Sequence, residues 1–279
     1  MTVGVFRSGS KIDESLLEQG KAKFKEISDL EIREFEIKKN NTVYFSGNSV
    51  QRSDSFLKVY EDKNIEFLWA ARGGYGTIEI LNQLSTQGKE WSGKKIIGYS
   101  DVTALHSFLS NIGIASYHAP MIATQKWSES ADKPLESMSN LFKGKSLLPI
   151  PVESDCNIKG RIVGGNLSVL ASLMGTPWQL KLQKGDILLL EDINEPYYAL
   201  ARSLKQLSYS PNFYECSLCW GELTQCGTDF KSEHELIAAL SDPYGLKNRM
   251  GLQVGHGSVN YCLRLGANVT IDGQLLYCD

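Results

Sequence analysis

The chain has 279 residues, of which 42% are hydrophobic and 22% charged, and its formal net charge is −3. This ordinary globular composition excludes disordered, collagen-like and low-complexity chains. No basic field for nucleic acid is visible, and the longest strongly apolar stretch, residues 187–190, is far shorter than the roughly 20 residues that cross a bilayer. Residues 1–7 read as a first strand and not as a signal peptide, so we expect a soluble cytoplasmic protein without nucleic-acid or membrane partners.

Strand and helix patterns alternate through the first half of the chain. The expected strands are residues 3–6, 34–37, 65–71 and 95–97, and the expected helices are residues 13–28, 54–61, 77–84 and 102–111. Repeated strand–helix units of this size indicate a parallel sheet covered on both faces. We therefore predict an N-terminal parallel-sheet α/β domain, flavodoxin- or amidotransferase-like, over residues 1–145.

The second half has a different pattern. Residues 146–160, which contain two prolines, are predicted to be a linker to a smaller, β-rich α/β domain over residues 161–279. The expected elements are helices at 166–174 and 197–207, a strand at 187–190, and mainly strands after residue 216, closing with a hairpin-like series at 261–265, 268–271 and 274–278.

Ser100 lies in a Gly-Tyr-Ser-Asp turn between an expected strand and an expected helix. Such a turn exposes a side chain at the carboxyl edge of a sheet, where the free N–H groups of the helix could hold a developing oxyanion. The Gly-x-Ser-x-Gly pattern of α/β-hydrolases is not met, because Val102 occupies the place of the last glycine. From the turn alone, a helix cap is the simpler interpretation of Ser100.

The densest glycine cluster, residues 72–76 (RGGYG), also follows an expected strand. It fits neither a dinucleotide fingerprint nor a P-loop. Because turns at the carboxyl ends of neighbouring parallel strands face one crevice, this loop could offer an N–H toward Ser100. An ordinary strand–helix turn explains the local pattern equally well.

Glu191 ends the apolar run at 187–190, and a carboxylate at the end of a buried strand is costly unless it is paired. The best partner among the four histidines is His256, which stands between two glycines on a strand-like segment. His106 and His118 lie near the same candidate site. We expect His106 on the polar face of its helix, either at the surface or behind the site, and His234 on a solvated helix.

Three cysteines, Cys216, Cys219 and Cys226, form a short cluster without a second Cys-x-x-Cys pair to complete four zinc ligands. They are better explained as buried reduced thiols than as a metal site. We expect no metal and no cofactor.

Taken together, these fragments resemble the serine LD-carboxypeptidases (muramoyltetrapeptide carboxypeptidases), a family that includes the microcin-type self-immunity peptidases. The resemblance covers nearly the whole chain in family order: residues 72–76 (RGGYG), 98–101 (GYSD), 164–167 (GGNL) with 175–178 (GTPW), 190–195 (LEDINE), and 255–256 (GH) with 265–266 (LG).

The resemblance implies a catalytic triad of Ser100 as nucleophile, His256 as general base and then acid, and Glu191 as the group that orients the imidazole. It also implies an oxyanion hole made by the backbone N–H of Asp101 with that of Gly73 or Gly74. The implied reaction releases terminal D-alanine from murein tetrapeptide in peptidoglycan recycling, and a homodimer is implied by resemblance alone.

Recognition of the substrate's free carboxylate calls for a cation, and Arg72 and Arg202 are candidates by position. Arg202 could equally be an ordinary helix-surface residue. The opening segment, residues 4–10, departs from the Ala-Pro-Ser type common in the family, and the chain ends soon after residues 265–266. One alternative function is a self-immunity peptidase that cleaves a peptidyl- or aminoacyl-nucleotide antibiotic with the same triad. Another is an inactive module that binds a peptide or sugar.

Overall fold

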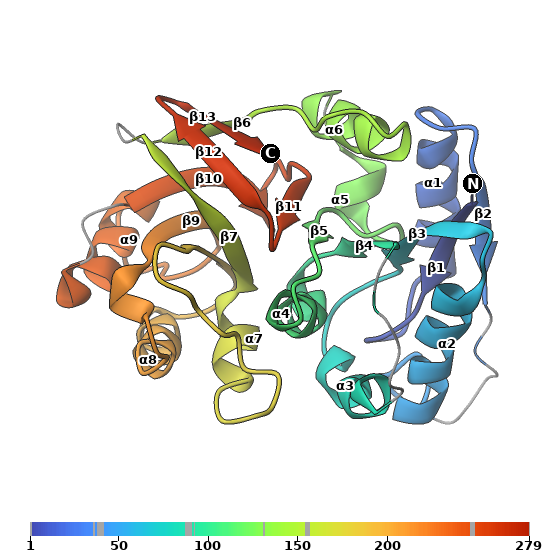
Figure 1. Cartoon of the computed structure of the whole chain (residues 1–279), viewed down its shortest axis with the longest axis horizontal. Coiled ribbons are helices and arrows are strands. Elements are labelled where there is room, and N and C mark those ends of the chain that lie inside the picture. The colour runs from blue at the N-terminus through green and yellow to red at the C-terminus, as the bar shows by residue number, and fades with distance from the viewer. Residues whose placement is uncertain are drawn as a thin grey trace.

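Two bodies of different architecture lie side by side in the computed structural model, which describes residues 2–35, 37, 42–86, 91, 93–130, 132–153, 157–245 and 249–278 (Figure 1). One body is built on an open sheet and the other on a closed barrel. The chain begins in the open-sheet body, forms the barrel, and returns one late strand to the open sheet.

The open sheet has six strands in the order β11-β5-β4-β3-β1-β2. Their bounds are β1 (Thr2–Phe6), β2 (Glu31–Glu34), β3 (Ile65–Ala70), β4 (Lys95–Gly98), β5 (Ser116–His118) and β11 (Leu263–Leu265). Neighbouring strands are parallel except for β11, which runs antiparallel to β5.

Helices cover both faces of the open sheet (Figure 1). They are α1 (Glu14–Lys25), α2 (Ser49–Glu61), α3 (Thr77–Ser85), α4 (Thr103–Asn111), α5 (Gln125–Ser128) and α6 (Asp132–Phe142). One buried cluster joins the sheet to α1, α5 and α6 through residues such as Phe24 and Trp127. A second cluster joins the opposite face to α2, α3 and α4 through residues such as Phe56 and Leu105. Burial on both faces explains why the central strands β1 and β3 read as nearly continuous apolar runs.

The barrel closes in the strand order β10-β6-β13-β12-β7-β8-β9. Its strands are β6 (Ile150–Glu153), β7 (Ile158–Asn166), β8 (Ile187–Ile193), β9 (Ser217–Thr224), β10 (Arg249–Gly255), β12 (Asn268–Asp272) and β13 (Leu275–Cys278). From β7 through β8 and β9 to β10 each pair is parallel, whereas the pairs that involve β6, β12 or β13 are antiparallel.

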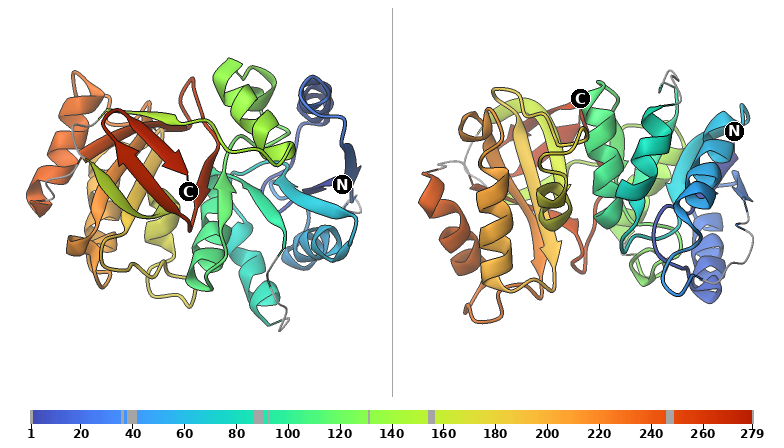
Figure 2. Two further views of the ribbon diagram at one scale, coloured as in Figure 1. Left: turned by 45° about the horizontal axis from the view of Figure 1, so that its top comes forward. Right: turned by 90° about the horizontal axis from the view of Figure 1, so that it is seen from below.

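Three helices pack on the barrel: α7 (Leu167–Ser172), α8 (Tyr197–Leu207) and α9 (Glu233–Ser241). Figure 2 shows α9 at the end of the molecule farthest from the open sheet. Short 3₁₀ turns complete the described elements: η1 (Ser100–Val102), η2 (Phe213–Glu215) and η3 (Asp242–Tyr244).

Side-chain caps explain where several helices begin. Asp13 accepts a hydrogen bond from the Ser15 amide at the start of α1. Asn48 and Gln51 form a reciprocal capping box at the start of α2, and Asn166 caps α7. Each cap satisfies an N–H group that the helix itself leaves without a partner.

The predicted fold class is confirmed: a parallel-sheet α/β unit is followed by a β-rich unit with helices. The closure of the second unit into a barrel was not predicted. Strand periodicity reports which side chains are buried, but it does not report which strands pair across long stretches of chain.

Three segments lie elsewhere than the sequence patterns indicated. The strand expected at 34–37 is β2, at Glu31–Glu34. The predicted linker, 146–160, contains β6 and the first residues of β7, while residues 154–156 lie outside the described residues. In the expected series of three closing strands, only β12 and β13 form the hairpin, because β11 leaves it to pair with β5. The division into domains at 1–145 and 161–279 remains our proposal.

Among the helices within the described ranges, none combines the length and the apolar character that spanning a bilayer requires.

Candidate active site

The turn after β4 holds Ser100 in an unusual backbone conformation. Ser100 has a φ of 60°, in the left-handed region that non-glycine residues rarely adopt, at a cost of about 1–3 kcal/mol. A helix cap has an extended backbone and a side chain that accepts from the first turn, but η1 begins after Tyr99 and neither η1 nor α4 has a side-chain cap. The helix-cap interpretation of Ser100 is therefore wrong. A strained serine between a strand and a helix is the geometry of an exposed nucleophile.

Gly98 allows this turn to be sharp. A β-carbon at Gly98 would lie 2.9 Å from the Val102 side chain, closer than real contacts allow, and 3.0 Å from the Ala70 β-carbon, a separation that real contacts seldom reach. The glycine that precedes the Tyr99-Ser100 step is thus required by the close approach of the helix to β3 and β4.

Asp101 joins the Ser100 turn to the glycine-rich loop. Its buried carboxylate accepts hydrogen bonds from the Thr77 amide at 2.9 Å and the Gly76 amide at 3.2 Å, and the Thr77 hydroxyl lies 2.7 Å away. Burial raises the pKa of the Asp101 carboxyl, against the effect of these bonds. Because its carboxylate accepts hydrogen bonds from the start of α3, Asp101 fixes the Ser100 turn relative to the glycine-rich loop.

Gly73 lies closest to Ser100 in that loop. A β-carbon on Gly73 would stand 3.2 Å from the Ser100 β-carbon and 3.3 Å from its Oγ, whereas one on Gly74 would meet Ser10 and Tyr44. The Gly73 carbonyl accepts from the Ser10 amide at 3.0 Å, so the N–H of the Gly73–Gly74 peptide points away from Ser10. The loop therefore presents bare backbone beside the serine.

Glu191 and His256 form a short hydrogen bond. The Nδ1 of His256 lies 2.6 Å from Glu191 Oε2, and the carboxylate is completely buried. The two residues come from the carboxyl ends of β8 and β10, which flank β9 in a parallel arrangement. Gly221 and Gly255 leave room for the acid, since a β-carbon at either would approach the Glu191 side chain to about 3 Å.

The buried carboxylate of Glu191 lies between two imidazoles, those of His256 and His118. Burial by itself would raise the pKa of the Glu191 carboxyl, but the facing imidazoles of His256 and His118 outweigh burial and lower it to about 2. Glu191 is thus ionised at neutral pH, and its carboxylate accepts from the His256 Nδ1–H. This leaves the opposite ring nitrogen, Nε2, as the one available to exchange a proton.

Contacts between the two bodies bring this pair to the Ser100 turn. The rings of Tyr99 and His256 lie 4.7 Å apart between centroids, and Tyr99 immediately precedes Ser100. Close by, Thr103 Oγ1 accepts a 3.0 Å hydrogen bond from the Asn166 amide of the barrel. The three predicted triad residues are thus gathered around one contact between the open sheet and the barrel.

Some residues at this contact were not predicted from the sequence. Asp192, next to Glu191, accepts from the Asn166 side chain at 2.9 Å and from the Ser168 amide at 2.9 Å, so it fixes the start of α7 to β8. Burial raises the pKa of Asp192. In the sequence, Asp192 could be singled out only by its position directly after Glu191.

Of the two expected positions of His106, at the surface or behind the candidate site, the surface position is wrong. His106 is buried, with ring nitrogens 2.8 Å from Ser116 Oγ and 2.9 Å from the Gly98 carbonyl, and burial lowers its pKa to about 3. The neighbouring sheet and barrel cover the helix face that looked polar in sequence. His234, as expected, is exposed, and it lies 3.6 Å from Glu153.

The two candidate cations lie apart from each other. Arg72 is exposed at the start of the glycine-rich loop and donates to the Lys11 carbonyl at 3.1 Å. Arg202 lies on α8, over the ring of Tyr198 at 5.7 Å, and its charge acts on the carboxyl of Glu195. Neither contact identifies a bound carboxylate, so both assignments remain proposals.

Cys216, Cys219 and Cys226 are buried, and Cys216 and Cys226 are free thiols. Burial raises the pKa of the thiol to about 12 at Cys216 and about 11 at Cys226. Within the described part of the chain, no group of three or more His, Cys, Asp or Glu side chains could hold a metal ion. Cys156 lies outside the described residues.

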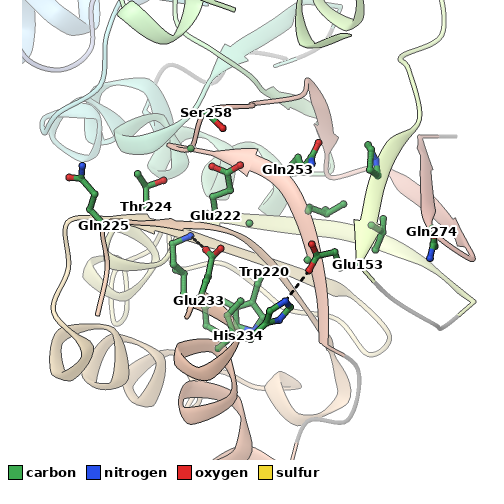
Figure 3. A pocket seen from close by; sticks show the side chains of 18 residues that line it. Glu153, Trp220, Glu222, Thr224, Gln225, Glu233, His234, Gln253, Ser258 and Gln274 are labelled. Carbon is green, nitrogen blue, oxygen red and sulfur yellow. Dashed lines mark hydrogen bonds and ion pairs between the residues drawn. The ribbon is translucent and has the colours of Figure 1, made fainter. Parts of the chain in front are cut away.

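A cavity of about 1120 Å³ lies on the outside of the barrel between β9, β10 and α9 (Figure 3). Polar side chains dominate it, and Figure 3 shows Glu222, Glu233 and Gln253 around it. Gly257 and Ser258, which follow His256, form part of its wall. Burial, followed by the charge of Glu233, raises the pKa of Glu222 to about 6. The cavity thus adjoins the His256 loop without containing the triad candidates.

Both halves of the chain match domains of one family. Residues 3–119 match the LD-carboxypeptidase N-terminal domain, and residues 159–271 match the LD-carboxypeptidase C-terminal domain. The murein tetrapeptide carboxypeptidase of Pseudomonas aeruginosa is 29% identical over 84% of this chain and 81% of its own length. The microcin C7 self-immunity protein of Escherichia coli is 24% identical over 82% of this chain and 77% of its own length. The crystal structure of muramoyltetrapeptide carboxypeptidase from Oxalobacter formigenes shares the fold, with a TM-score of 0.83 at 22% identity, over 100% of this chain and 98% of that one.

Proposed function

Because the chain belongs to the LD-carboxypeptidase family, we propose that it is a serine carboxypeptidase that releases terminal D-alanine from murein tetrapeptide. The observation that carries the proposal is the 2.6 Å bond between buried Glu191 and His256, packed against the residue that precedes the strained Ser100. A serine, an imidazole and a buried carboxylate in this relation make up the machinery of acyl transfer.

In the first half of the reaction, Ser100 Oγ attacks the carbonyl carbon of the L-configured centre that is joined to D-alanine. His256 Nε2 takes the serine proton, while Glu191 stabilises the imidazolium through Nδ1–H. The oxyanion accepts from the backbone N–H of Asp101 and from that of Gly73 or Gly74. His256 then gives its proton to the amine of D-alanine, the C–N bond breaks, and D-alanine leaves an acyl-enzyme.

In the second half, His256 takes a proton from water as the water oxygen attacks the acyl carbon. The tetrahedral intermediate collapses, the ester bond to Ser100 breaks, and the proton returns to Ser100 Oγ. The Asp101 carboxylate takes no part in these transfers. It holds Gly76 and Thr77, so that the two backbone donors keep their spacing.

Arg72 is the better of the two candidates for the substrate's terminal carboxylate. It belongs to the same loop as Gly73, which lies against Ser100, whereas Arg202 is on a helix outside the barrel. A guanidinium binds a carboxylate through two parallel N–H groups, which suits recognition of a free chain end.

A second candidate substrate is a peptidyl- or aminoacyl-nucleotide, and the similarity to the microcin C7 self-immunity protein favours it. Stacking of a nucleobase calls for an accessible aromatic ring. Trp127 is completely buried and donates Nε1–H to the Gly20 carbonyl, and Trp178 packs partly buried against the core of the open-sheet body. Neither tryptophan thus offers a fully exposed ring, whereas the ring of Tyr75 in the glycine-rich loop is half-exposed, and the substrate panel below decides between the two substrates.

The test combines a substrate panel with active-site labelling. The protein is incubated with murein tetrapeptide and with an aminoacyl sulfamoyl adenosine, and the products are identified by mass. A fluorophosphonate probe is applied to the wild type and to Ser100→Ala. We expect D-alanine release from the tetrapeptide and labelling of the wild type alone. Turnover of the nucleotide substrate alone would favour the immunity function, and binding without turnover or labelling would favour an inactive module.

The proposal extends to a homodimer that works in the cytoplasm on a recycled peptide, with no cofactor and no nucleic-acid partner. Light scattering of the purified protein measures the subunit number. A monomer at working concentration would contradict the dimer and leave the catalytic assignment intact.

A further inference from the structure

His118 is a buried histidine that the proposed mechanism does not use. It ends β5, is completely buried, and neither of its ring nitrogens has a hydrogen-bond partner among the described residues. The Oε1 atom of Glu191 is likewise buried without a partner there. The two meet across the contact between the open sheet and the barrel, with His118 Nε2 3.9 Å from Glu191 Oε1.

Leaving both groups unpaired is costly. A buried polar atom that has lost water without gaining a partner costs about 1–3 kcal/mol, and more when it carries charge. The separation exceeds an ordinary N–H···O bond by about 1 Å, which a slight approach of β8 to β5 would close. Since His118 Nε2–H can donate and Glu191 Oε1 can accept, each group can supply the hydrogen-bond partner that the other lacks.

We propose that His118 is a positioning residue for Glu191, donating Nε2–H to Oε1 while His256 donates Nδ1–H to Oε2. The inference rests on the proposed function of Glu191 and His256. A carboxylate held at both oxygens has a fixed plane, so the imidazole of His256 keeps its orientation through both halves of the reaction. Because His118 belongs to the open sheet and Glu191 to the barrel, the bond also ties the acid of the barrel to the body that carries Ser100.

The surroundings leave this role to His118. From the turn after β4, the Tyr99 ring lies 5.7 Å from the His118 ring. From α4, His106 faces Gly98 and Ser116, with its ring 6.5 Å from that of His118. On β8, the Asp192 carboxylate is turned to Asn166 and Ser168.

On the remaining sides, the apolar Leu263 of β11 pairs with His118, and its neighbour Arg264 pairs with Tyr117. His256 already occupies Glu191 Oε2. His118 is thus the imidazole that is placed to donate a hydrogen bond to Glu191 Oε1.

The inference has a direction in pH. A donor on Oε1 stabilises the charged carboxylate, so its removal raises the proton affinity of the Glu191–His256 pair. The acid limb of kcat/KM, where activity is lost as the pair takes up a proton, therefore moves to higher pH in a variant without the donor. A hydrogen bond to a charged group corresponds to a shift of about one pH unit and a fall in kcat of about tenfold to a hundredfold, with KM little changed.

The test compares His118→Phe, which keeps a ring and loses the donor, with His118→Gln, which keeps an N–H donor. The matched control is His106→Gln, because His106 is an equally buried imidazole in the same cluster that does not contact Glu191. We expect the acid limb to shift in His118→Phe, to shift less in His118→Gln, and to stay in place in His106→Gln. Thermal unfolding of each variant measures how far the substitution destabilises the fold, apart from its effect on catalysis. An unmoved acid limb and unchanged kcat in folded His118→Phe, or an equal shift in His106→Gln, would overturn the inference.

A measurement on the wild type covers the case in which His118→Phe does not fold. Nitrogen-15 NMR of the histidine rings should show the His118 proton on Nε2, and a proton on Nδ1 alone would also overturn the inference. The two levels of proposal fail differently. If Ser100→Ala keeps full turnover or the wild type is not labelled, the triad itself is wrong. If the wild type is labelled and active but His118→Phe behaves like it, only the role of His118 is wrong.

Discussion

Replacing Glu191 by glutamine tests the proposed catalytic geometry most directly. The substitution keeps the shape and burial of the side chain but removes the charge that faces His256 Nδ1 at 2.6 Å. A pKa lowered from 4.5 to about 2 corresponds to roughly 3 kcal/mol of preferential stabilisation of the ionised form. His118 contributes part of this stabilisation. Because the imidazolium forms in the transition state, losing the part that comes from His256 lowers kcat about a hundredfold.

A second effect adds to the loss. The glutamine amide can donate to Nδ1 and so favour the imidazole tautomer with its proton on Nε2, which cannot act as the base toward Ser100. We therefore expect kcat for D-alanine release to fall between about a hundredfold and ten-thousandfold, with KM within about threefold of the wild type. The rate of fluorophosphonate labelling should fall in parallel, because it depends on the same proton transfer.

The control is Glu153→Gln, which removes an exposed carboxylate on the barrel that lies 3.6 Å from the exposed His234. Both proteins are checked by circular dichroism and thermal unfolding. Glu153→Gln should keep wild-type kinetics. A folded Glu191→Gln enzyme that retains more than about a tenth of wild-type kcat would refute the reasoning that the buried carboxylate stabilises the catalytic imidazolium.

Three further substitutions test the turn, the loop and the cavity. Ser100→Gly should abolish turnover yet raise the free energy of unfolding by about 1 kcal/mol in urea titration, because glycine adopts a φ of 60° without strain, and a destabilised variant would contradict this. Gly73→Ala should lower kcat at least tenfold with little loss of thermal stability, since the new methyl would stand 3.3 Å from Ser100 Oγ. A kcat equal to that of the wild type would contradict this, because it would mean that the loop shifts to make room for the methyl. Glu222→Gln should stabilise the protein above about pH 6 by about 1 kcal/mol after allowance for solvent screening. The folded-state pKa of about 6 exceeds the usual 4.5, so the charged form costs stability as pH rises between these values; urea titrations at pH 4 and pH 7 that show equal effects would contradict this.

The local parts of the site could be predicted from the sequence because each is a short contiguous pattern. The strand, Gly98, Ser100 and the following helix could be predicted from apolar periodicity and from the glycine at the turn. Glu191 was prominent because an acid at the end of a buried strand needs a partner. Even so, the sequence by itself favoured a helix cap for Ser100, since the φ of 60° that argues against a cap has no counterpart in residue type.

The parts that could not be predicted depend on pairing between distant segments. Strand β5 has only three residues, too few for a periodic signal, and its neighbour β11 lies about 150 residues further along the chain. The burial of His106 follows from the same pairing, because Ser116 of β5 contacts its ring. The contact between His118 and Glu191 likewise exists only once the sheet and the barrel are docked.

The return of β11 to the open sheet also explains how the proposed base comes to lie against Tyr99, the residue that precedes the proposed nucleophile. His256 lies in the segment that leaves β10 in the barrel and enters β11 in the open sheet, so it is anchored to both bodies within a few residues. Lys126 of α5 strengthens this attachment by donating to the Gly257 carbonyl. A general base carried by the connection between two bodies cannot move away from Ser100 unless β11 or the Lys126 contact also yields. The proposed triad is therefore aligned when the sheet and the barrel dock. The stability of the contact between them determines how accurately His256 is held relative to Ser100.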